Sequence, residues 1–410
     1  MASESDTRLA YTAPKFTIDL SLPPEDRYKA LAEAYKSQLQ GLTGLFNDLL
    51  RDLGLPIHYH GLVNRAARLL LRGVHSPIEN AELRGIAEVT GVPMYLLVSF
   101  NVILDLLMGC TSGAVRCLEK GQPPFEAKML HFRTLDWTMD PLRSVIVQLE
   151  FIRTKSANPS EVLARSITYV GFVGFLTGVR KGLSLSLNFR AVHNASTKRG
   201  HFEFYFHHLL VLLGYRQSIS SLLRSYMISE SEDRDQPRTL AEISQDVDSR
   251  RTTAAYMIFS DGVWTIVIEK DHKTAKVRRS DTFIAITNHD VENHNGGSAS
   301  ITPAADEVGN HSKGVAAGLH DLLDESRDRL ACISSKWEAH VQKAQQQTKR
   351  KTTDAGHIAT DVAITQGRLI TWLSAWPTSN EYTHFAAVLD PATGDVVWTR
   401  AYRVPIKAPG

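Results

Sequence analysis

The segment Met108-Gly109-Cys110-Thr111-Ser112-Gly113 marks the place where the character of the sequence changes. Before it, apolar residues recur with helical spacing, and after it short runs rich in β-branched residues predominate. The run LSLSLN at 183–188 alternates with a period of two, as a strand with one buried face does. Asp261-Gly262 separates two apolar runs and signals a hairpin turn. Helices, strands, helices and strands in this order predict an α+β layered fold rather than alternating βαβ units.

The apolar spacing sets the elements that we expect on each side of this segment. Between Tyr28 and Leu53 the steps of three, four or seven predict one long helix, which Gly54 and Pro56 end. Further helices are expected over 61–72, 81–89 and 93–107, two more over 202–245, and a long polar helix over 315–349. Strands are expected over 145–152, 183–188, 256–259, 263–268, 282–287, 369–375, 383–389 and 396–402. Residues 293–314 read as a loop.

The composition excludes several classes of protein. Of the 410 residues, 43% are hydrophobic and 22% charged, which is typical of a globular chain with a sizeable core. A formal net charge of +2 argues against a nucleic-acid coat, so we expect no nucleic-acid partner. The N-terminus lacks the basic start and apolar core of a signal peptide, and no apolar run reaches roughly 18 residues. The expectation is a soluble, cytoplasmic protein.

The three cysteines, Cys110, Cys117 and Cys332, are too few for a disulfide framework and form no CxxC pair. The motifs GxSxG, HExxH, GxGxxG and the Walker A loop are absent, and the histidine groups at 58/60 and 201/207/208 lack the spacing of a metal set. We therefore expect no metal and no cofactor. Cys332 is expected to pack within the long helix, and Cys117 is expected to be a loop thiol.

Cys110 stands apart because two charged residues follow it in an apolar, strand-like segment. Arg133 and Asp136 lie three residues apart in His131-Phe-Arg-Thr-Leu-Asp-Trp137. A lone charge would be costly to bury there. Two interpretations stay open: the pair forms a structural ion pair, or it lies beside a thiol and tunes its reactivity.

Five motifs, in order, resemble the family of acid ceramidase and N-acylethanolamine-hydrolysing acid amidase. They are CTS at 110–112, HFRTLDW at 131–137, YVGFVGFLTG at 169–178, LSLSLN at 183–188 and ITNHD at 286–290. The resemblance extends upstream over 13–31 and 81–93. The enzymes of that family are similar, more distantly, to bile salt hydrolases and penicillin V acylases. The resemblance implies an N-terminal nucleophile hydrolase with a four-layer αββα sandwich preceded by a helical segment.

The resemblance also implies that the chain cuts itself between Gly109 and Cys110. Residues 1–109 would then be an α-subunit and residues 110–410 a catalytic β-subunit, which remain one globular unit as a self-cleaved heterodimer. Cleavage frees an α-amino group on Cys110. Because an α-amine titrates at about 7.7–8.0 and a thiol at about 8.5, one residue then carries both a base and a nucleophile.

The resemblance assigns roles to further residues. Arg133 is expected to favour the thiolate, and Asp136 to bind the new α-amino group. Asn288 is expected to donate its side-chain N–H to the oxyanion of the tetrahedral intermediate. Asn188 and Thr111 are candidates for supporting roles.

The sequence departs from the family pattern in several places. Phe189 stands where the family has a glutamate, and Asn188 beside it is expected to substitute. Residues 290–312 contain no arginine, although the family carries one shortly after the ITNHD segment, and Lys313 is the nearest cation.

The resemblance implies hydrolysis of a fatty-acyl amide, of the ceramide or N-acylethanolamine class, through a thioester on Cys110. Two alternatives stay open: an acyltransferase on the same scaffold, and an uncleaved lipid-binding pseudoenzyme. The N-terminal helices offer either a transient membrane contact or a face packed on the sandwich. The residues concerned are Leu42, Leu45, Phe46, Leu49 and Leu50, with Arg65, Arg68 and Arg72 nearby.

Overall fold

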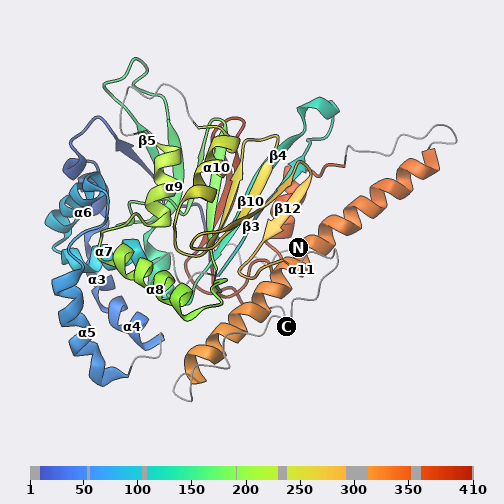
Figure 1. Cartoon of the computed structure of the whole chain (residues 1–410). Coiled ribbons are helices and arrows are strands. Elements are labelled where there is room, and N and C mark those ends of the chain that lie inside the picture. The colour runs from blue at the N-terminus through green and yellow to red at the C-terminus, as the bar shows by residue number, and fades with distance from the viewer. Residues whose placement is uncertain are drawn as a thin grey trace.

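The computed structural model describes residues 10–52, 56–103, 109–190, 192–229, 238–291, 313–351 and 362–408. Two β-sheets lie face to face in the middle of the molecule, and helices cover them from outside (Figure 1). The predicted loop over 293–314 lies almost entirely outside the described residues.

The first sheet carries the segment on which the sequence analysis began. Its strand order is β1 (Ala10–Tyr11), β14 (Asp395–Tyr402), β13 (Thr383–Asp390), β4 (Lys128–Asp136), β3 (Gly109–Cys117) and β12 (Phe283–Ile286). Every pairing in it is antiparallel. β3 and β4 are therefore central strands, and their side chains are almost all buried.

The second sheet has eight strands. Its order is β11 (Ala275–Ser280), β10 (Thr265–Lys270), β9 (Ala255–Ser260), β8 (Leu183–Phe189), β7 (Thr177–Arg180), β6 (Ala164–Tyr169), β5 (Ile146–Ile152) and β2 (Lys15–Asp19). Only β2 and β5 pair in parallel. The predicted hairpin at Asp261-Gly262 joins β9 to β10, and Gly262 has a positive φ of 96° as such a turn requires.

Helices on both outer faces complete four layers. On the second sheet, α9 (Ile219–Met227) contacts β7 and β8, and α10 (Leu240–Ser249) contacts β10 and β11. On the first sheet, α11 (Lys313–Lys351) contacts β3 and β12, and α12 (Gln366–Leu373) contacts β4. The predicted α+β fold with an αββα sandwich is confirmed.

The N-terminal segment is mostly helical, as predicted, but it also supplies strands. β1 extends the first sheet and β2 extends the second, so residues before Gly109 are built into both. The helices are α2 (Lys29–Ala34), α3 (Lys36–Gly41), α4 (Leu45–Asp52), α5 (Ile57–Leu70), α6 (Pro77–Thr90) and α7 (Met94–Ile103). They gather at one end of the sandwich beside α8 (Lys198–Leu212) (Figure 1).

The prediction of one long helix from Tyr28 to Leu53 is wrong. Tyr35 leaves the helical conformation, with φ −116° and ψ 16°, so that α2 ends and α3 begins there. A short 3₁₀ turn over Leu42–Gly44 then separates α3 from α4. The glycines at its two ends lower the helical propensity there.

The predicted strand over 369–375 is also wrong, because residues 369–373 belong to α12 and the helix ends at Leu373. Thr365 caps this helix by accepting a hydrogen bond from the backbone N–H of Arg368. Leu369, Trp372 and Leu373 are buried at steps of three and four residues, which is a helical period. A third helix in the region 202–245 was likewise not predicted, since α8, α9 and α10 all fall there.

Two further findings concern the described residues as a whole. Within the described ranges, no helix is long and apolar enough to span a membrane. The same ranges contain no group of three or more histidine, cysteine or acidic side chains arranged to hold a metal ion.

Candidate active site

Cys110 lies on β3 and points into the space between the two sheets. It pairs with Leu135 on β4, and Ser112 pairs with Arg133. Because alternate residues of a strand share a face, these four side chains point to the same side. Cys110 and Leu135 both belong to the main hydrophobic core, and Cys110 is completely buried.

Arg133 contacts the thiol directly. Its Nη2 lies 3.1 Å from Cys110 Sγ, and its Nη1 donates to the carbonyl of Leu176 at 2.7 Å. Burial nevertheless raises the pKa of the Cys110 thiol to about 11, against the opposing effect of the Arg133 guanidinium. In the intact chain, the thiol is therefore protonated at neutral pH.

Asn288 contacts the backbone nitrogen of Cys110. The Cys110 N–H donates to Asn288 Oδ1 at 2.8 Å, and Asn288 Nδ2 donates to the carbonyl of Phe189 at 2.9 Å. These partners orient the amide with its oxygen toward Cys110. The expected donation from Asn288 to an oxyanion stays a prediction, because the group that faces Cys110 here is an acceptor.

Asp136 does not form the ion pair with Arg133 that one of our interpretations described. Its carboxylate accepts from Thr383 Oγ1 at 2.7 Å and lies 3.5 Å from Arg329 Nε. Burial raises the pKa of Asp136, although Arg329 and the Thr383 hydroxyl act in the opposite direction. Contacts through Arg329 and Asn288 link the Asp136 carboxylate to the Cys110 nitrogen.

Arg329 is the site residue that sequence reasoning missed. It comes from α11, is 1% exposed, and lies 3.1 Å by its Nη2 from Asn288 Oδ1 as well as near Asp136. The family pattern places a second arginine shortly after Asn288, whereas this one follows Asn288 by 41 positions. The sequence of α11 reads as polar and gives no local signal, although Ser326, Arg329 and Ile333 are buried at helical spacing in the structure.

The two supporting candidates lie close to the site without touching the thiol. Asn188 donates to the carbonyls of Ile286 and Thr287 at 3.3 and 3.1 Å, and accepts from Ser112 Oγ at 2.7 Å. It therefore holds β3 and the end of β12 in register, just before Asn288. The buried hydroxyl of Thr111 has no hydrogen-bond partner among the described residues.

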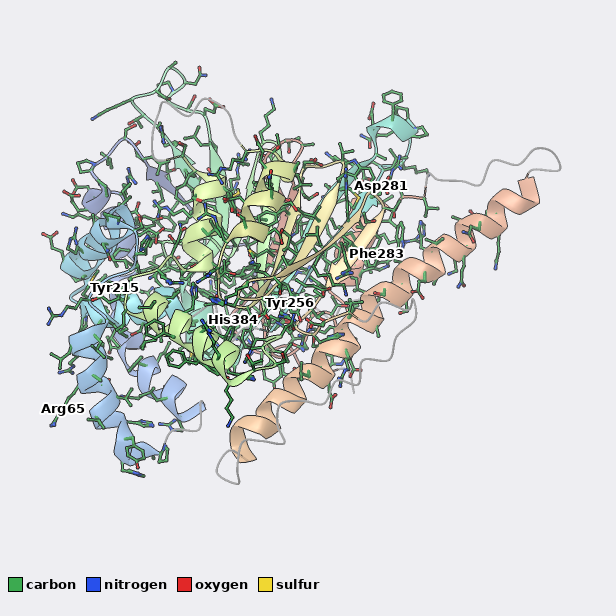
Figure 2. All side chains as sticks on the ribbon, in the orientation of Figure 1. Arg65, Tyr215, Tyr256, Asp281, Phe283 and His384 are labelled. Carbon is green, nitrogen blue, oxygen red and sulfur yellow. The ribbon has the colours of Figure 1, made fainter. Side chains whose placement is uncertain are left out.

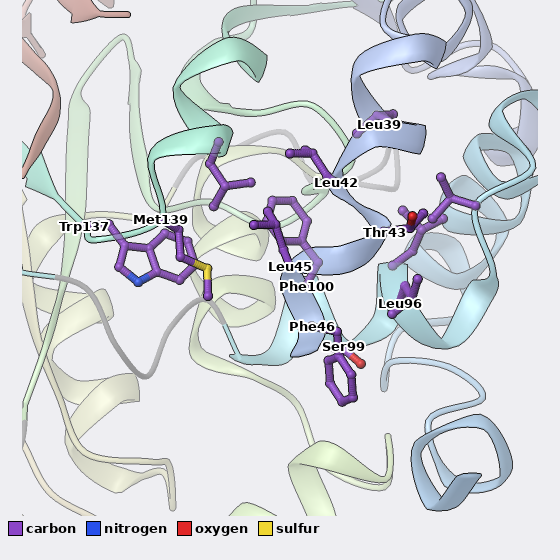
Figure 3. A pocket seen from close by; sticks show the side chains of 13 residues that line it. Leu39, Leu42, Thr43, Leu45, Phe46, Leu96, Ser99, Phe100, Trp137 and Met139 are labelled. Carbon is purple, nitrogen blue, oxygen red and sulfur yellow. The ribbon is translucent and has the colours of Figure 1, made fainter. Parts of the chain in front are cut away.

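An apolar cavity of about 640 Å³, including the space at its open side, lies between the N-terminal helices and the residues that follow β4. Figure 3 shows Trp137 and Met139 on one side of it and α3, α4 and α7 residues on the other. The ring centroid of Tyr169 lies 6.4 Å from that of Trp137 and 6.3 Å from that of Phe100. Both Trp137 and Phe100 line the cavity. Tyr169 also lies near enough to Cys110 for the thiol to influence its pKa.

The positions of the N-terminal leucines favour the packed alternative over a membrane contact. Leu42, Leu45 and Phe46 line it, and Leu50 is 5% exposed, so these four do not form an outer face. The side chain of Leu49 lies outside what the structure describes. The exposed apolar residues of these helices lie on α5 instead, namely Ile57, Tyr59, Leu62, Leu69 and Leu70.

Cys117 is not a loop thiol. It is the last residue of β3, is 4% exposed, and packs in a second core cluster under α11 and α12. Cys110 and Arg133 are separated in the sequence because β3 runs on to Cys117 before the chain returns along β4 from Lys128. Cys332 is half-buried on α11, with its sulfur 3.9 Å from the carbonyl of Trp376.

In comparisons with known proteins, the chain is similar to acid ceramidases and to N-acylethanolamine-hydrolyzing acid amidases. A family model described as the beta subunit of N-acylethanolamine-hydrolyzing acid amidase matches residues 11–75. Acid ceramidase of Mus musculus is 31% identical over 196 residues, which is 43% of this chain and 45% of the relative. The probable acid ceramidase of Caenorhabditis elegans is 28% identical over 183 residues, 42% of this chain and 44% of the relative. The chain thus spans about half the length of the curated relatives it matches.

Among solved structures, the N-acylethanolamine-hydrolyzing acid amidase ortholog of Caenorhabditis elegans aligns with 71% of this chain and 98% of its own. The sequence identity is 17% and the TM-score is 0.41. The matched family model falls within the segment before Gly109, which we named the α-subunit.

Proposed function

Because the chain is similar to acid ceramidases and to the N-acylethanolamine-hydrolyzing acid amidase family model, we propose that it is a self-processing cysteine amidase that hydrolyses fatty-acyl amides. One observation carries the proposal. The sulfur of Cys110 lies 3.1 Å from a buried guanidinium while its nitrogen lies 2.8 Å from the Asn288 amide oxygen. A residue that acts as nucleophile through its side chain and as base through its nitrogen needs partners at both atoms.

The proposed activation is cleavage of the Gly109–Cys110 bond. The Cys110 thiol attacks the Gly109 carbonyl carbon, the C–S bond forms, and the C–N bond breaks as the nitrogen takes up the thiol proton. Water then hydrolyses the thioester, which leaves a carboxyl group on Gly109 and a free thiol and α-amine on Cys110. A Cβ at Gly109 would lie 3.4 Å from the Asp136 Cβ and 3.6 Å from Arg329 Nη2, so the bond to be cut lies beside both residues.

In the proposed substrate reaction, the α-amine of Cys110 takes the proton from its own thiol. The thiolate attacks the carbonyl carbon of the amide, and the amine product leaves with the proton. The acyl group remains on sulfur as a thioester until water releases it. The Arg133 guanidinium beside the sulfur stabilises the thiolate, as a fixed positive charge does for a cysteine nucleophile.

Arg329 has a positioning role in this proposal. It lies between the Asp136 carboxylate and the Asn288 oxygen, at 3.5 and 3.1 Å. A permanently charged guanidinium there opposes the effect of burial, which raises the pKa of the Asp136 carboxyl. The same contact fixes the amide oxygen that accepts from the Cys110 nitrogen. In this proposal, Arg329 is therefore the second arginine of the site, although it lies outside 290–312.

The apolar cavity supports the choice of a fatty-acyl substrate. Trp137 follows Asp136 directly in the sequence, so the cavity begins one residue from the site. Burying a hydrocarbon chain in such a cavity contributes about 0.8 kcal/mol per CH₂ group. We propose that the acyl chain occupies it, and that the exposed apolar residues of α5 contact the membrane from which a lipid amide is taken.

Hydrolysis of a lipid-amide panel tests the proposal. Ceramides and N-acylethanolamines of several chain lengths are incubated with the wild type, with Cys110→Ala and with Cys117→Ala as a matched control. We expect fatty acid release by the wild type and by Cys117→Ala, and none by Cys110→Ala. Acyl transfer to an added amine in place of water would identify the acyltransferase alternative. Release of fatty acid by Cys110→Ala would refute the role of this thiol.

A further inference from the structure

A second cavity is lined by arginine and histidine side chains, none of which belongs to the Cys110 site. It measures about 690 Å³, including the space at its open side. Arg216, Arg250, Arg251, His75 and His207 line it, and none of the described residues that line it is acidic. We call this cavity the cationic pocket.

The pocket lies where the two segments of the chain meet. Tyr215, at the edge of the pocket and 71% exposed, lies between α8 and the N-terminal helices (Figure 2). A Cβ on Gly214 would be 2.4 Å from the Gly73 carbonyl oxygen, so the loop after α8 touches the chain before α6. His75 therefore reaches the pocket from the N-terminal segment, while the arginines come from the segment after Cys110.

His207 presents a hydrogen-bond donor that has no acceptor. It is 3% exposed, and Arg216 Nη1 lies 2.7 Å from its Nδ1. A guanidinium can only donate, so Nδ1 is the acceptor and the ring proton lies on Nε2. The Nε2 atom is buried and has no hydrogen-bond partner among the described residues. A buried N–H without an acceptor is costly, which indicates a ligand that accepts.

The surroundings of His207 are positive. The pKa of His207 is lowered to about 3 by burial first, and then by His272, Arg216, His208 and Arg251, so the ring stays neutral. Arg250 is partly neutralised, since its Nε lies 2.9 Å from Asp246 Oδ2. Arg251 forms no ion pair with any described residue. Two full positive charges thus face the cavity beside an N–H donor.

We propose that the cationic pocket binds a phosphate-type oxyanion, carried by a free phosphate monoester or by the headgroup of an anionic lipid. Tetrahedral oxyanions accept several hydrogen bonds and pair with arginine in bidentate geometry, which is the chemistry that Arg216, Arg251 and His207 offer. The bound group would contact His75 and the arginines together. It would therefore hold the two segments to each other at a point that shares no lining residue with the Cys110 site.

Calorimetric titration of inorganic phosphate into the full chain tests the proposal, in chloride buffer of matched ionic strength. We expect saturable binding by the wild type and by Cys110→Ala, so the result does not depend on amidase activity. Arg216→Gln and Arg251→Gln each weaken binding by about tenfold or more, because each removes a charge-assisted hydrogen bond. His207→Phe, which keeps a ring beside His272, has a similar effect.

Arg199→Gln is the matched control, since this arginine is on α8 with a side chain that is 89% exposed. It leaves phosphate binding unchanged. Vesicles of phosphatidylcholine with and without phosphatidic acid distinguish the two sources. If the vesicles that contain phosphatidic acid compete with inorganic phosphate for the pocket, the ligand is a lipid headgroup. If they do not compete, the ligand is a free phosphate ester. Phosphate binding that is absent, or equal in Arg216→Gln, Arg251→Gln and the wild type, overturns the proposal.

Discussion

Two buried arginines divide the contacts around Cys110. Arg133 Nη2 lies against the thiol, whereas Arg329 holds the Asn288 oxygen that accepts from the Cys110 nitrogen. Asp136 contacts Arg329 rather than Arg133, and its charge also raises the pKa of the Cys110 thiol. At the scale of residues, the site is a chain of contacts from Thr383 through Asp136, Arg329 and Asn288 to Cys110.

Arg329→Gln tests this chain of contacts. The variant removes the charge between Asp136 and Asn288, and we expect kcat to fall by about 100-fold because the Cys110 nitrogen loses its orientation. The pH profile of kcat also shifts, since the Asp136 carboxylate loses the cation that opposes the effect of burial on its pKa. A residue that only stabilises the fold would leave this profile unchanged.

Arg327→Gln is the control for that experiment, because it lies on the same helix with a side chain that is 61% exposed. It retains wild-type turnover. An Arg329→Gln variant with normal kcat and a normal pH profile contradicts the positioning role.

Cys117 offers a second test at this scale. Burial raises the pKa of its thiol to about 12. Below that pH the thiol is protonated, so only about one thiol in 10⁵ is ionised at pH 7, rising tenfold per pH unit. We expect a maleimide to label Cys117 slowly in the folded protein and quickly in denaturant, as read by peptide mass spectrometry. Equal labelling rates in both conditions would show that the thiol is not buried.

At the scale of elements, β3 and β4 position the site, and α6 links the N-terminal segment to α9. Glu82 on α6 accepts from Arg27 Nη1 at 3.0 Å and from Arg224 Nη2 at 2.7 Å, and its side chain is fully buried. Arg224 belongs to α9, which follows the proposed cleavage site in the sequence. This ion triad therefore joins the two segments without a disulfide.

Removing the carboxylate of this triad tests its contribution to stability. Glu82→Gln leaves Arg27 and Arg224 without their shared anion, and breaking a buried ion pair from one side costs about 3–5 kcal/mol. Denaturant unfolding measures the free energy of unfolding. Glu88→Gln, on the same helix with a side chain that is 70% exposed, changes it by less than about 0.5 kcal/mol. Equal stability of both variants would argue against a structural triad.

The sequence pattern predicted the elements of the sheets better than it predicted the partners of the site. The strands around Cys110 and Arg133 follow from local runs of apolar residues, and so does the layered α+β class. The segment 369–375 was misread because its short apolar run fits a strand or a helix, and the Thr365 cap decides between them. Arg329 was missed because its burial depends on how α11 packs on β3 and β12, which no local pattern contains.

At the scale of the whole molecule, the N-terminal helices and the sandwich enclose the apolar cavity together. Leu42 comes from the N-terminal segment and Met139 from the segment after Cys110, and both line the cavity. A self-cleaved enzyme would therefore need both products to form its acyl site.

Filling this cavity should change the preferred acyl length. Leu42→Trp places a larger ring in the cavity, so we expect hydrolysis of long-chain amides to fall by about tenfold relative to short-chain amides. The ratio of kcat/KM for the two substrates is the measurement, which is insensitive to a loss of folded protein. Leu62→Trp, at an α5 position that is 66% exposed, leaves the ratio unchanged. An unchanged ratio in Leu42→Trp would place the acyl chain elsewhere.

The central claim is that Cys110 becomes the N-terminus of a second polypeptide by its own chemistry. Intact-mass spectrometry of the purified protein, after incubation across acidic to neutral pH, tests it most directly. We predict two chains with the masses of residues 1–109 and 110–410 for the wild type, and a single uncut chain for Cys110→Ala. A wild-type chain that stays whole at every pH, or a cut that persists in Cys110→Ala, would contradict the account.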